Sequence, residues 1–482
     1  MATTLVSTGL QFPDASIQTT AVTAGQFTAT ASGAITNGNK LVVNSDGTVS
    51  AVAATSITPV VNAKFAYRNG NPATFLASAF NGTYFVFVYT VSSTAYAICG
   101  KLNGTNIIFG NEVTLEASST SQDVTCDTST GNFVLSWVNT GGAGKACVAS
   151  VTDNVLTTYT AVGVATAGVI ACEYDSTNNK VVFAYGYGSN QGFAKVGTIS
   201  GNDLTVGTAA NFTTSVPADT ICLQEDKTNG KIVVAYRNTS SGNQGFAAVG
   251  TVSGTSISFG TPVQFGGDTD ILRIKSTYDT TNSKIIFTYS YNGETSYTIV
   301  ATVSGTSISF GTEQTFATDT SAYPAVAYDF ANQKVFLTYS NDTLGGCEYV
   351  SGTLSGTSIS YGTPAVFDTD GGGAFANVAI RGLGILVNYY DGTGTIGGRG
   401  VLISTSSTNL TSKNYVGIAN NSYSNGATAT VQTTGSVDDA QSGLTTGKPY
   451  YLQMDGTLSL APDPLNVYAG LSISATKIVV KG

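Results

Sequence analysis

Two pairs of aspartates come closest to a catalytic arrangement in this chain. Asp268 and Asp270 stand two residues apart in a glycine-rich stretch, and Asp368 and Asp370 repeat the pattern 100 residues later. Two carboxylates that flank a sugar bond are what glycoside hydrolysis requires. The same Asp-x-Asp pattern is more often turn chemistry or a weak Ca²⁺ contact. Because the chain has no histidine, no nucleophile elbow and no phosphate loop, we expect no enzyme activity.

The six cysteines form no CxxC pair, and the chain has no histidine to complete a zinc site. We expect the thiols to be small buried residues, because free cysteine is among the most buried residue types. Disulfides stay open as an alternative. The sequence therefore predicts neither a metal nor a cofactor. The residues concerned are Cys99, Cys126, Cys147, Cys172, Cys222 and Cys347.

Amide, carboxylate and tyrosine side chains in the variable connections are better suited to binding than to catalysis. Such groups can hydrogen-bond sugar hydroxyls, and loops on a rigid scaffold are where binding residues usually lie. The alternative is drift in unconstrained loops. The predicted receptor-binding residues are Asn190, Gln191, Asn243, Gln244, Asp268, Asp270, Tyr291, Asn292, Asp319, Asp368, Asp370, Tyr390 and Asp391.

A repeat with a period near fifty residues must position these side chains. Seven short apolar runs, from VFVY to LVNY, each end in one aromatic residue, at intervals of 48 to 53 residues. A period of this length in a β-rich sequence indicates a repeat architecture. We call these residues the marker aromatics: Tyr89, Trp137, Tyr185, Tyr236, Tyr289, Tyr339 and Tyr389.

Each repeat divides into four predicted strands. The first strand ends at an acidic residue, and a D-x-x-x-x-K turn leads to the second strand, which carries the marker aromatic. A variable loop precedes the third strand, and a Ser-Gly turn leads to a fourth such as SISFGTPVQF. Asp175, Asp226, Asp279 and Asp329 can accept hydrogen bonds from backbone N–H groups two residues on, so we expect them to be structural. Gly201, Gly254, Gly305 and Gly356 can supply the positive φ of a two-residue hairpin.

These features predict an all-β protein with a seven-bladed β-propeller of four-stranded blades over residues 74–418. A β-solenoid is the main rival, but its rungs are shorter than this repeat. We expect each marker aromatic to pack between neighbouring blades with its polar tip bonded or wet. The two variable sets of connections, from second to third strand and from one blade to the next, should lie on the same face.

Small N- and C-terminal β modules are predicted on either side of the repeats, over residues 31–73, which include a linker, and 419–482. Three flanking stretches share a step of nine residues between glycines: Gly38 to Gly47, Gly426 to Gly435, and Gly447 to Gly456. Each is typical of a β-hairpin with its own turn, so we expect the modules to be related.

Charge and hydropathy exclude several classes of partner. The formal net charge is −9 with no run of basic residues, which argues against nucleic acid. No apolar stretch approaches eighteen residues, so no membrane insertion is expected. The N-terminus lacks the basic start and apolar core of a secretory signal.

The opening STGLQFPDASIQTTAV resembles the start of many bacteriophage tail fibres and virion appendages, in which a G-x-x-FPD-x-x-x-QTTA stretch is frequent. The closing GLTTGKPYYLQMDGTLS and AGLSISATKIVVKG are similar to a C-terminal module of marine-phage structural proteins. The resemblance implies that residues 1–30 attach to other virion proteins and that the chain is a homo-oligomer, with a trimer favoured. Residence in the virion follows from the same resemblance.

Three functions fit this reading. The first is a phage tail fibre or appendage that binds a host-surface glycan or protein through one face of the propeller. The second is a purely structural capsid fibre or connector. The third and weakest is a polysaccharide-degrading enzyme built on the aspartate pairs described above.

Overall fold

The computed structural model describes residues 4–6, 9–11, 17–18 and 25–481, except 69, 72, 188–190, 214–217, 240–241, 268–269, 292–294, 319–322, 371, 381, 392–396, 461 and 464. The described residues form antiparallel strands and turns without an α-helix, which confirms the all-β prediction. No helix in this part of the chain has the length and apolarity to cross a membrane.

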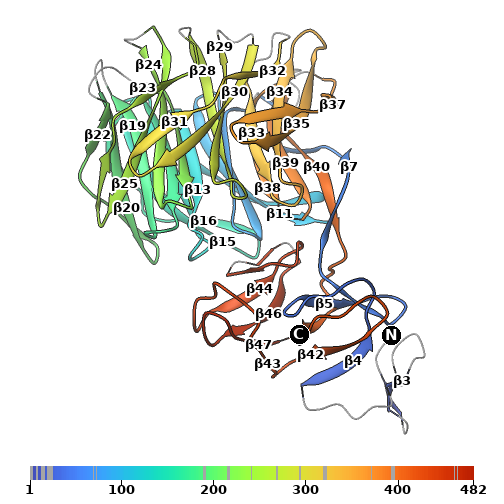
Figure 1. Ribbon diagram of the computed structural model, residues 1–482. Helices are drawn as coiled ribbons and strands as arrows, with labels where there is room; N and C mark the ends of the chain where they lie inside the picture. The colour runs from blue at the N-terminus through green and yellow to red at the C-terminus, as the bar shows by residue number, and fades with distance from the viewer. Residues whose placement is uncertain are drawn as a thin grey trace. The chain divides into compact units, whose positions relative to one another are not determined.

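The chain divides into two compact units (Figure 1). Unit 1 contains residues Met1–Thr58, Arg381–Leu383 and Ser406–Gly482. Unit 2 contains Pro59–Ile380 and Gly384–Thr405, so it is enclosed in the sequence by unit 1.

Unit 2 consists of seven antiparallel sheets, and six of them are built from strands that follow one another in the chain. The first is β9 (Thr74–Phe80), β10 (Tyr84–Val91), β11 (Thr94–Asn103) and β12 (Asn106–Glu116). The second is β13 (Ser119–Cys126), β14 (Phe133–Asn139), β15 (Ala143–Thr152), β16 (Val155–Thr158) and β17 (Val162–Thr166). The third is β18 (Val169–Asp175), β19 (Lys180–Tyr187), β20 (Gln191–Ser200), β21 (Asp203–Val206) and β22 (Ala210–Thr213). The fourth is β23 (Ala218–Asp226), β24 (Lys231–Asn238), β25 (Gln244–Ser253), β26 (Ser256–Phe259) and β27 (Val263–Phe265).

The remaining three sheets repeat this order. The fifth is β28 (Ile271–Asp279), β29 (Lys284–Tyr291), β30 (Thr295–Ser304), β31 (Ser307–Phe310) and β32 (Gln314–Ala317). The sixth is β33 (Ala325–Asp329), β34 (Lys334–Asn341), β35 (Gly346–Ser355), β36 (Ser358–Tyr361) and β37 (Ala365–Asp368). The seventh is β38 (Gly372–Ile380), β39 (Gly384–Asp391) and β40 (Gly398–Thr408), completed by β7 (Ala54–Val61) and β8 (Phe65–Arg68).

The first strand of each sheet packs against the first strand of the next. These contacts run in order through β9, β13, β18, β23, β28, β33 and β38, and β38 in turn packs against β9. The connection from first to second strand lies at one end of the sheets, which we call the turn end. The connections from second to third strand and from sheet to sheet lie at the other, the loop end.

The last predicted strand of each repeat is divided in two in six of the seven sheets described. In the fourth sheet, β26 and β27 both pair with β25 and are separated by Gly260-Thr261-Pro262. Pro262 has no N–H to give to the ladder. A Cβ on Gly260 would lie 2.0 Å from the carbonyl oxygen of Thr306, so the chain here passes directly against the fifth sheet. The prediction of four strands per repeat therefore missed a strand.

The seventh sheet takes its last two strands from the beginning of the chain. β40 pairs with both β7 and β8, which lie about 340 residues earlier. The sequence placed these residues in the module and linker 31–73, and placed the start of the repeats at residue 74. Unit 2 instead begins at Pro59 and ends at Thr405. The sequence analysis missed β7 and β8 because the marker aromatic belongs to the second strand of a sheet. These two strands are the outer strands of the seventh sheet and have no such residue.

The marker aromatics are all buried, at 5% exposure or less. In five sheets the ring packs on an aromatic residue from the preceding sheet's last strand. Tyr289 and Phe265 are typical, with ring centroids 5.5 Å apart. The corresponding pairs are Tyr67–Tyr89, Phe212–Tyr236, Phe316–Tyr339 and Phe367–Tyr389. These aromatic pairs agree with the predicted position of the markers between neighbouring sheets.

A glycine in the third strand makes room for three of these aromatic partners, Phe212, Phe265 and Tyr67. A Cβ on Gly245 would lie 2.7 Å from Phe265 and from Ile271, and one on Gly192 would lie 2.4 Å from Phe212. Contacts this short leave no space for a methyl group, because protein interiors are packed close to crystal density.

We expect the Gly245→Ala substitution to destabilise unit 2 by about 1–3 kcal/mol, as overpacking of a closed core does. Urea unfolding followed by tryptophan fluorescence and circular dichroism would measure it. Gly163→Ala is the control, since a Cβ there meets nothing within 4 Å. Equal stability of the two variants would contradict the packing argument.

The turn aspartates are structural, as predicted. Asp279 Oδ1 accepts hydrogen bonds from the N–H groups of Thr281 (2.8 Å) and Asn282 (3.0 Å), and its Oδ2 accepts one from Asn282 Nδ2. Asp127, Asp175, Asp226 and Asp329 make equivalent bonds and, like Asp279, are at most 4% exposed.

Unit 1 contains two five-stranded sheets and a small three-stranded one. The first sheet has the order β4 (Gln26–Thr30), β42 (Thr428–Gln432), β41 (Tyr415–Ala419), β5 (Lys40–Val43) and β6 (Val49–Ala51). The second has the order β43 (Val437–Asp438), β47 (Ile478–Val480), β46 (Val467–Ser472), β44 (Pro449–Leu452) and β45 (Leu458–Ser459). The three-stranded sheet is β1 (Thr4–Val6), β2 (Gly9–Gln11) and β3 (Ile17–Gln18).

The two larger sheets are copies of one module. Strand for strand, their orders match, and the hairpins β5–β6 and β44–β45 close with the same turn. Gly47 and Gly456 have φ of +79° and +84°, and each glycine N–H donates to the carbonyl three residues before it. Gly417 and Gly470 occupy matching bulges opposite Leu41 and Tyr450. The matching strand orders and turns agree with the predicted relation between the flanking modules.

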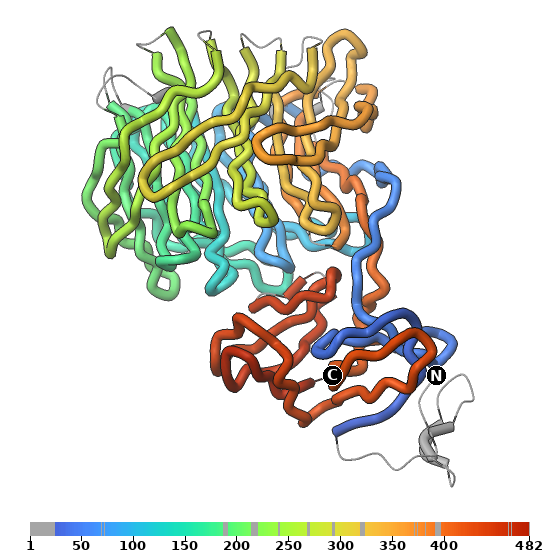
Figure 2. The backbone as a smooth tube through the Cα atoms, in the orientation of Figure 1, coloured from blue at the N-terminus to red at the C-terminus, as the bar shows by residue number. Residues whose placement is uncertain are grey.

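Unit 2 is inserted into the first copy of this module. The second copy is continuous, and a loop of seven residues, 460–466, joins β45 to β46. In the first copy, the equivalent step from β6 to β41 runs from Ala51 to Tyr415 and contains all of unit 2. Figure 2 shows the blue N-terminal segment beside the orange-red C-terminal one in unit 1.

One detail of the flanking prediction was wrong. The stretch from Gly426 to Gly435 shares the nine-residue step but forms no hairpin. It contains the single strand β42, which pairs with β4 and β41, and it leads into the second copy. Its glycines have positive φ because they begin and end a strand in the same way as the hairpin glycines do.

The insertion predicts that unit 1 folds without unit 2. We expect a variant in which residues 52–414 are replaced by a second copy of the 460–466 loop to unfold in one cooperative transition, with the circular dichroism of a β protein. Deleting the β44–β45 hairpin from that variant removes two of the five strands of the second sheet and should abolish the transition. A shortened variant that stays unfolded would contradict the modular insertion.

Candidate binding site at the loop end of unit 2

Several of the site residues predicted from the sequence are among the residues that the structure describes, and these lie at the loop end of unit 2. Gln191 and Gln244 begin the third strands β20 and β25, and Asn243 immediately precedes β25. The others lie at the ends of second strands or between sheets: Asp270, Tyr291, Asp368, Asp370, Tyr390 and Asp391. The predicted residues Asn190, Asp268, Asn292 and Asp319 lie outside the described residues.

The loop end joins neighbouring connections through charged and tyrosine side chains. Arg237, near the end of β24, forms an ion pair of 2.9 Å with Asp270, which precedes β28. Tyr291, at the end of β29, donates its hydroxyl to Glu313 Oε2 at 2.8 Å and accepts the Gly267 N–H. The two sets of variable connections therefore meet at one end of the sheets.

Asp368 and Asp370 are both held by Arg399. Asp368 is buried, and its carboxylate pairs with Lys64 Nζ (2.5 Å) and Arg399 (3.3 Å) and accepts the Tyr389 hydroxyl (2.5 Å). Asp370 pairs with the same guanidinium at 2.7 Å. Burial opposes ionisation of Asp368, but the hydrogen bonds from Lys64 and Tyr389 outweigh it and hold its pKa below the usual range.

This network does not suit the Asp368–Asp370 pair to glycoside hydrolysis. A retaining or inverting hydrolase needs one carboxyl group protonated near neutral pH, which requires a raised pKa. The pKa of Asp368 is lowered, and its carboxylate is already bonded to three side chains. In this arrangement the two carboxylates connect the end of β37 to Tyr389 on β39, to Arg399 on β40 and to Lys64 just before β8.

A polar cavity at the turn end was missed by the sequence analysis. Its volume is about 280 Å³, and it is lined mainly by the first strands of the first five sheets. The residue two positions before the turn residue lines the cavity in each of these strands: Ala79, Thr125, Glu173, Gln224 and Thr277. The polar residues at four of these positions were the signal that could have found it.

Polar side chains of the first strands, in the cavity and beside it, accept hydrogen bonds from the unpaired edges of neighbouring first strands. Asp123 Oδ2 accepts the Cys172 N–H at 3.0 Å, and Thr125 Oγ1 accepts the Tyr174 N–H at 3.1 Å. Glu173 Oε1 accepts the Glu225 N–H at 3.3 Å. Each acceptor belongs to the preceding sheet, so the polar residues satisfy backbone groups that no strand pairs.

The acids in this cavity have raised pKa values. Burial, assisted by repulsion from Glu225, raises the pKa of Glu173 to about 8. Burial also raises the pKa of Glu225, although Ser176 donates its N–H and its hydroxyl to that carboxylate at 2.6 and 2.5 Å. At neutral pH a protonated Glu173 can therefore donate a hydrogen bond in the cavity.

We expect Glu173 to make unit 2 less stable as the pH rises. The carboxyl pKa is about 4.3 in an unfolded chain and higher in the folded one, so protonation favours folding. The contribution of Glu173 to the free energy of unfolding should therefore be greatest below about pH 4. It should decrease as the pH rises to about 8. Glu173→Gln should remove the fall and stabilise at pH 9 by on the order of 3 kcal/mol.

Urea unfolding at successive pH values from 5 to 9 would measure this difference. Asp203→Asn is the control, because Asp203 is exposed on β21 and should leave the profile unchanged. A Glu173→Gln profile parallel to that of the wild type would show that the carboxyl group does not titrate as the cavity implies.

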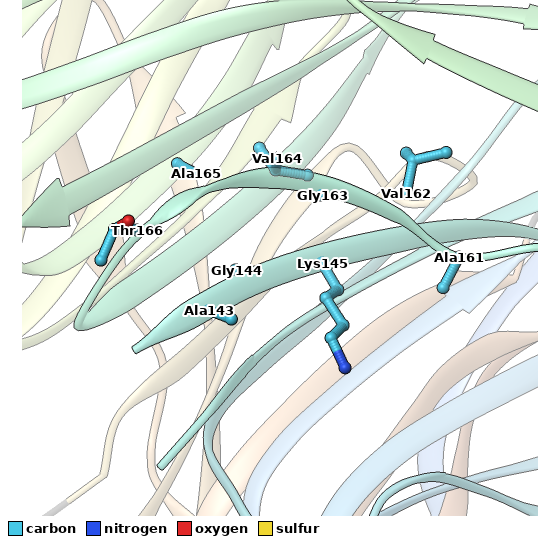
Figure 3. A pocket seen from close by; sticks show the side chains of 9 residues that line it. All are labelled: Ala143, Gly144, Lys145, Ala161, Val162, Gly163, Val164, Ala165 and Thr166. Atoms are coloured by element: carbon cyan, nitrogen blue, oxygen red, sulfur yellow. The ribbon is translucent and has the colours of Figure 1, made fainter. Parts of the chain in front are cut away.

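A second hollow, of about 460 Å³, lies beside β15 and β17 (Figure 3). Alanine, glycine and valine make up most of its lining. Lys145 points away from the side chains of Val162 and Val164, and its ammonium binds Glu116 at 2.7 Å. The hollow lies where the second sheet has Val164 in place of the aromatic residue found in later sheets, and it brings few polar groups together.

The six cysteines are unpaired, and all but Cys222 are buried, as expected. Burial raises the pKa of Cys147 to about 12 and that of Cys222 to about 11. These thiols are therefore not nucleophiles at neutral pH. Among the described residues, no cluster of three or more acidic, cysteine or histidine side chains is placed to hold a metal ion.

Comparison with known proteins gives only distant likenesses. The sequence matches no protein family and no curated protein. A Dyadobacter fermentans protein of unknown function is similar in structure, with 15% identity and a TM-score of 0.45, over 73% of this chain and 99% of that one. A mutant Aleuria aurantia lectin in complex with Fucα1-6GlcNAc has 15% identity and a TM-score of 0.42, over 62% and 98%. The fucose-specific lectin from the same organism has 13% identity and a TM-score of 0.42, over 62% and 97%.

Proposed function

We propose that this chain is an appendage protein of a phage virion in which unit 1 serves attachment and unit 2 presents a face that binds a host-surface glycan or protein. The observation that carries the proposal is the insertion of unit 2 into one loop of a duplicated module. Such a loop can carry an added domain without loss of the host fold, because its two connections leave side by side, with Ala53 and Asn409 hydrogen-bonded to each other.

In this proposal unit 2 is a closed seven-bladed β-propeller. Seven sheets and the contact of β38 with β9 support closure. The pairing of β40 with β7 and β8 supports it further, since strands from the beginning and end of unit 2 share one sheet. In a closed ring the inner edge of each sheet lies against the neighbouring first strands and is protected, which suits a protein exposed on a particle.

The receptor would contact the loop end. Its connections vary in length and content, whereas the turn end is built from repeated aspartate turns. Partly exposed Asp270 and Asp370 and half-buried Tyr291 and Tyr390 offer hydrogen-bonding and stacking groups there. Residues 1–30 would contact other virion proteins, and a trimer would multiply weak single contacts.

Electron microscopy and adsorption measurements test the proposal. Antibodies against unit 2 should label appendages on phage particles whose genomes encode this chain, and excess purified chain should lower adsorption of those particles to susceptible cells. The variant that lacks residues 52–414 is the control and should leave adsorption unchanged. Unlabelled particles, or equal adsorption with both proteins, would refute the proposal.

A further inference from the structure

Three bulky residues of unit 2 adopt a backbone conformation that side chains disfavour, outside any turn that requires it. Phe75, Arg273 and Tyr323 have φ of +52°, +57° and +63°. Most other non-glycine residues with positive φ lie in hairpin turns, such as Ser92, Asp153 and Gln333. A positive φ at a bulky residue is an outlier, and such strain gathers at functional sites.

The three residues occupy the same position in three repeats. Each stands six residues before the residue that opens the turn, namely Asn81, Asp279 and Asp329. This position lies at the loop end of the first strand. In the first and fifth sheets it is a β-bulge, in which two residues of β9 or β28 stand opposite the marker aromatic. Bulges redirect a side chain, often beside a binding site.

The sheets concerned are neighbours around the inner strands. β28 packs on β33, β33 on β38, and β38 on β9, so the fifth, sixth, seventh and first sheets follow one another. The Arg273 guanidinium lies over the Tyr323 ring, 3.8 Å from its centroid. Between Tyr323 and the first sheet, Gly373 leaves room for two rings, since its missing Cβ would lie 3.0 Å from both Tyr323 and Tyr390.

Two properties of this arc point to a ligand. Phe75 is 55% exposed, so burial offsets the strain of its backbone only in part. Arg273 Nη1 is buried, and it has no hydrogen-bond partner among the described residues. An unpaired guanidinium N–H is costly in a protein and is matched best by a carboxylate.

We propose that Phe75, Arg273, Tyr323 and Tyr390 form a subsite for an acidic oligosaccharide. Arg273 would donate hydrogen bonds to the carboxylate of one sugar, and the aromatic rings would stack on the apolar faces of that sugar and its neighbours. The inference rests on the proposed binding function of the loop end and names its ligand class. It also explains why Tyr390, predicted from the sequence, lies beside residues that were not predicted.

A glycan array of full-length chain, with sugars that differ only in a C6 carboxylate or hydroxymethyl group, tests the subsite. We expect the uronate member of each pair to bind at least tenfold more tightly than the neutral one. Arg273→Gln should remove that preference. Equal binding of the two sugars by the wild type would overturn the acidic ligand class.

The Phe75→Gly substitution distinguishes a loss of ligand binding from a loss of protein stability. Because glycine adopts positive φ without strain, we expect a Tm equal to or above that of the wild type, with binding at least tenfold weaker. Gln333→Gly relieves the same conformation at the turn end, where φ is +52°, and should leave binding unchanged. Undiminished binding by both Phe75→Gly and Arg273→Gln would overturn the subsite while leaving glycan binding elsewhere intact.

The same array distinguishes failure of the subsite from failure of glycan binding by unit 2. If the wild-type chain binds no glycan on the array, acidic or neutral, then glycan recognition by unit 2 is refuted together with the subsite. If it binds glycans and the variants bind them equally, only the subsite is refuted.

Discussion

The bare inner edge of each sheet is the constraint on which unit 2 depends. The first strand of a sheet pairs with its second strand on one side only, so half of its N–H and C=O groups face neighbouring first strands. An unpaired backbone group away from bulk water costs about as much as a lost hydrogen bond. Side chains satisfy some of these groups. Asp123 and Thr125 accept hydrogen bonds from N–H groups of β18, and Glu173 accepts one from an N–H group of β23. The architecture therefore requires polar residues in the first strands. Asp123 and Glu173 must be buried to reach these backbone groups, and burial raises their pKa values.

The same constraint separates the two ends of the sheets. At the turn end, the aspartate turns hold the chain in a repeated conformation, and side chains from the next sheet reinforce them. Tyr278, for example, donates to Asp226 at 2.9 Å, and Tyr328 donates to Thr281 at 2.8 Å. At the loop end, no common turn is imposed. Ion pairs such as Arg237–Asp270 and the bonds of Asp368 fix individual connections, and the first strands bulge away from regular pairing. Variation in side chains is tolerated there because the scaffold does not depend on it.

Much of this fold could be predicted because its signals are local and repeated. The marker aromatics recur because each sheet must fill the same wedge against its neighbour, and the turn aspartates recur because each turn leaves the same N–H groups unpaired. The candidate site was predicted less well. The sequence proposed Asp368 and Asp370 as the nearest acidic pair, but the distant Lys64 and Arg399 decide that both are ion-paired. Arg273 and Tyr323 escaped attention because a positive φ at a bulky residue leaves no trace in composition or period.

The sequence by itself determined the all-β class, the repeat, the turns and the kinship of the flanking modules, because each follows from contacts between residues near in the chain. Tertiary structure alone decided that β7 and β8 complete a sheet with β40, and that one flanking module is divided by the whole of unit 2. It also decided which acids share a cavity, and that Nη1 of Arg273 has no hydrogen-bond partner among the described residues. These outcomes depend on which distant edges and side chains meet, and a local pattern carries no record of its partner across hundreds of residues.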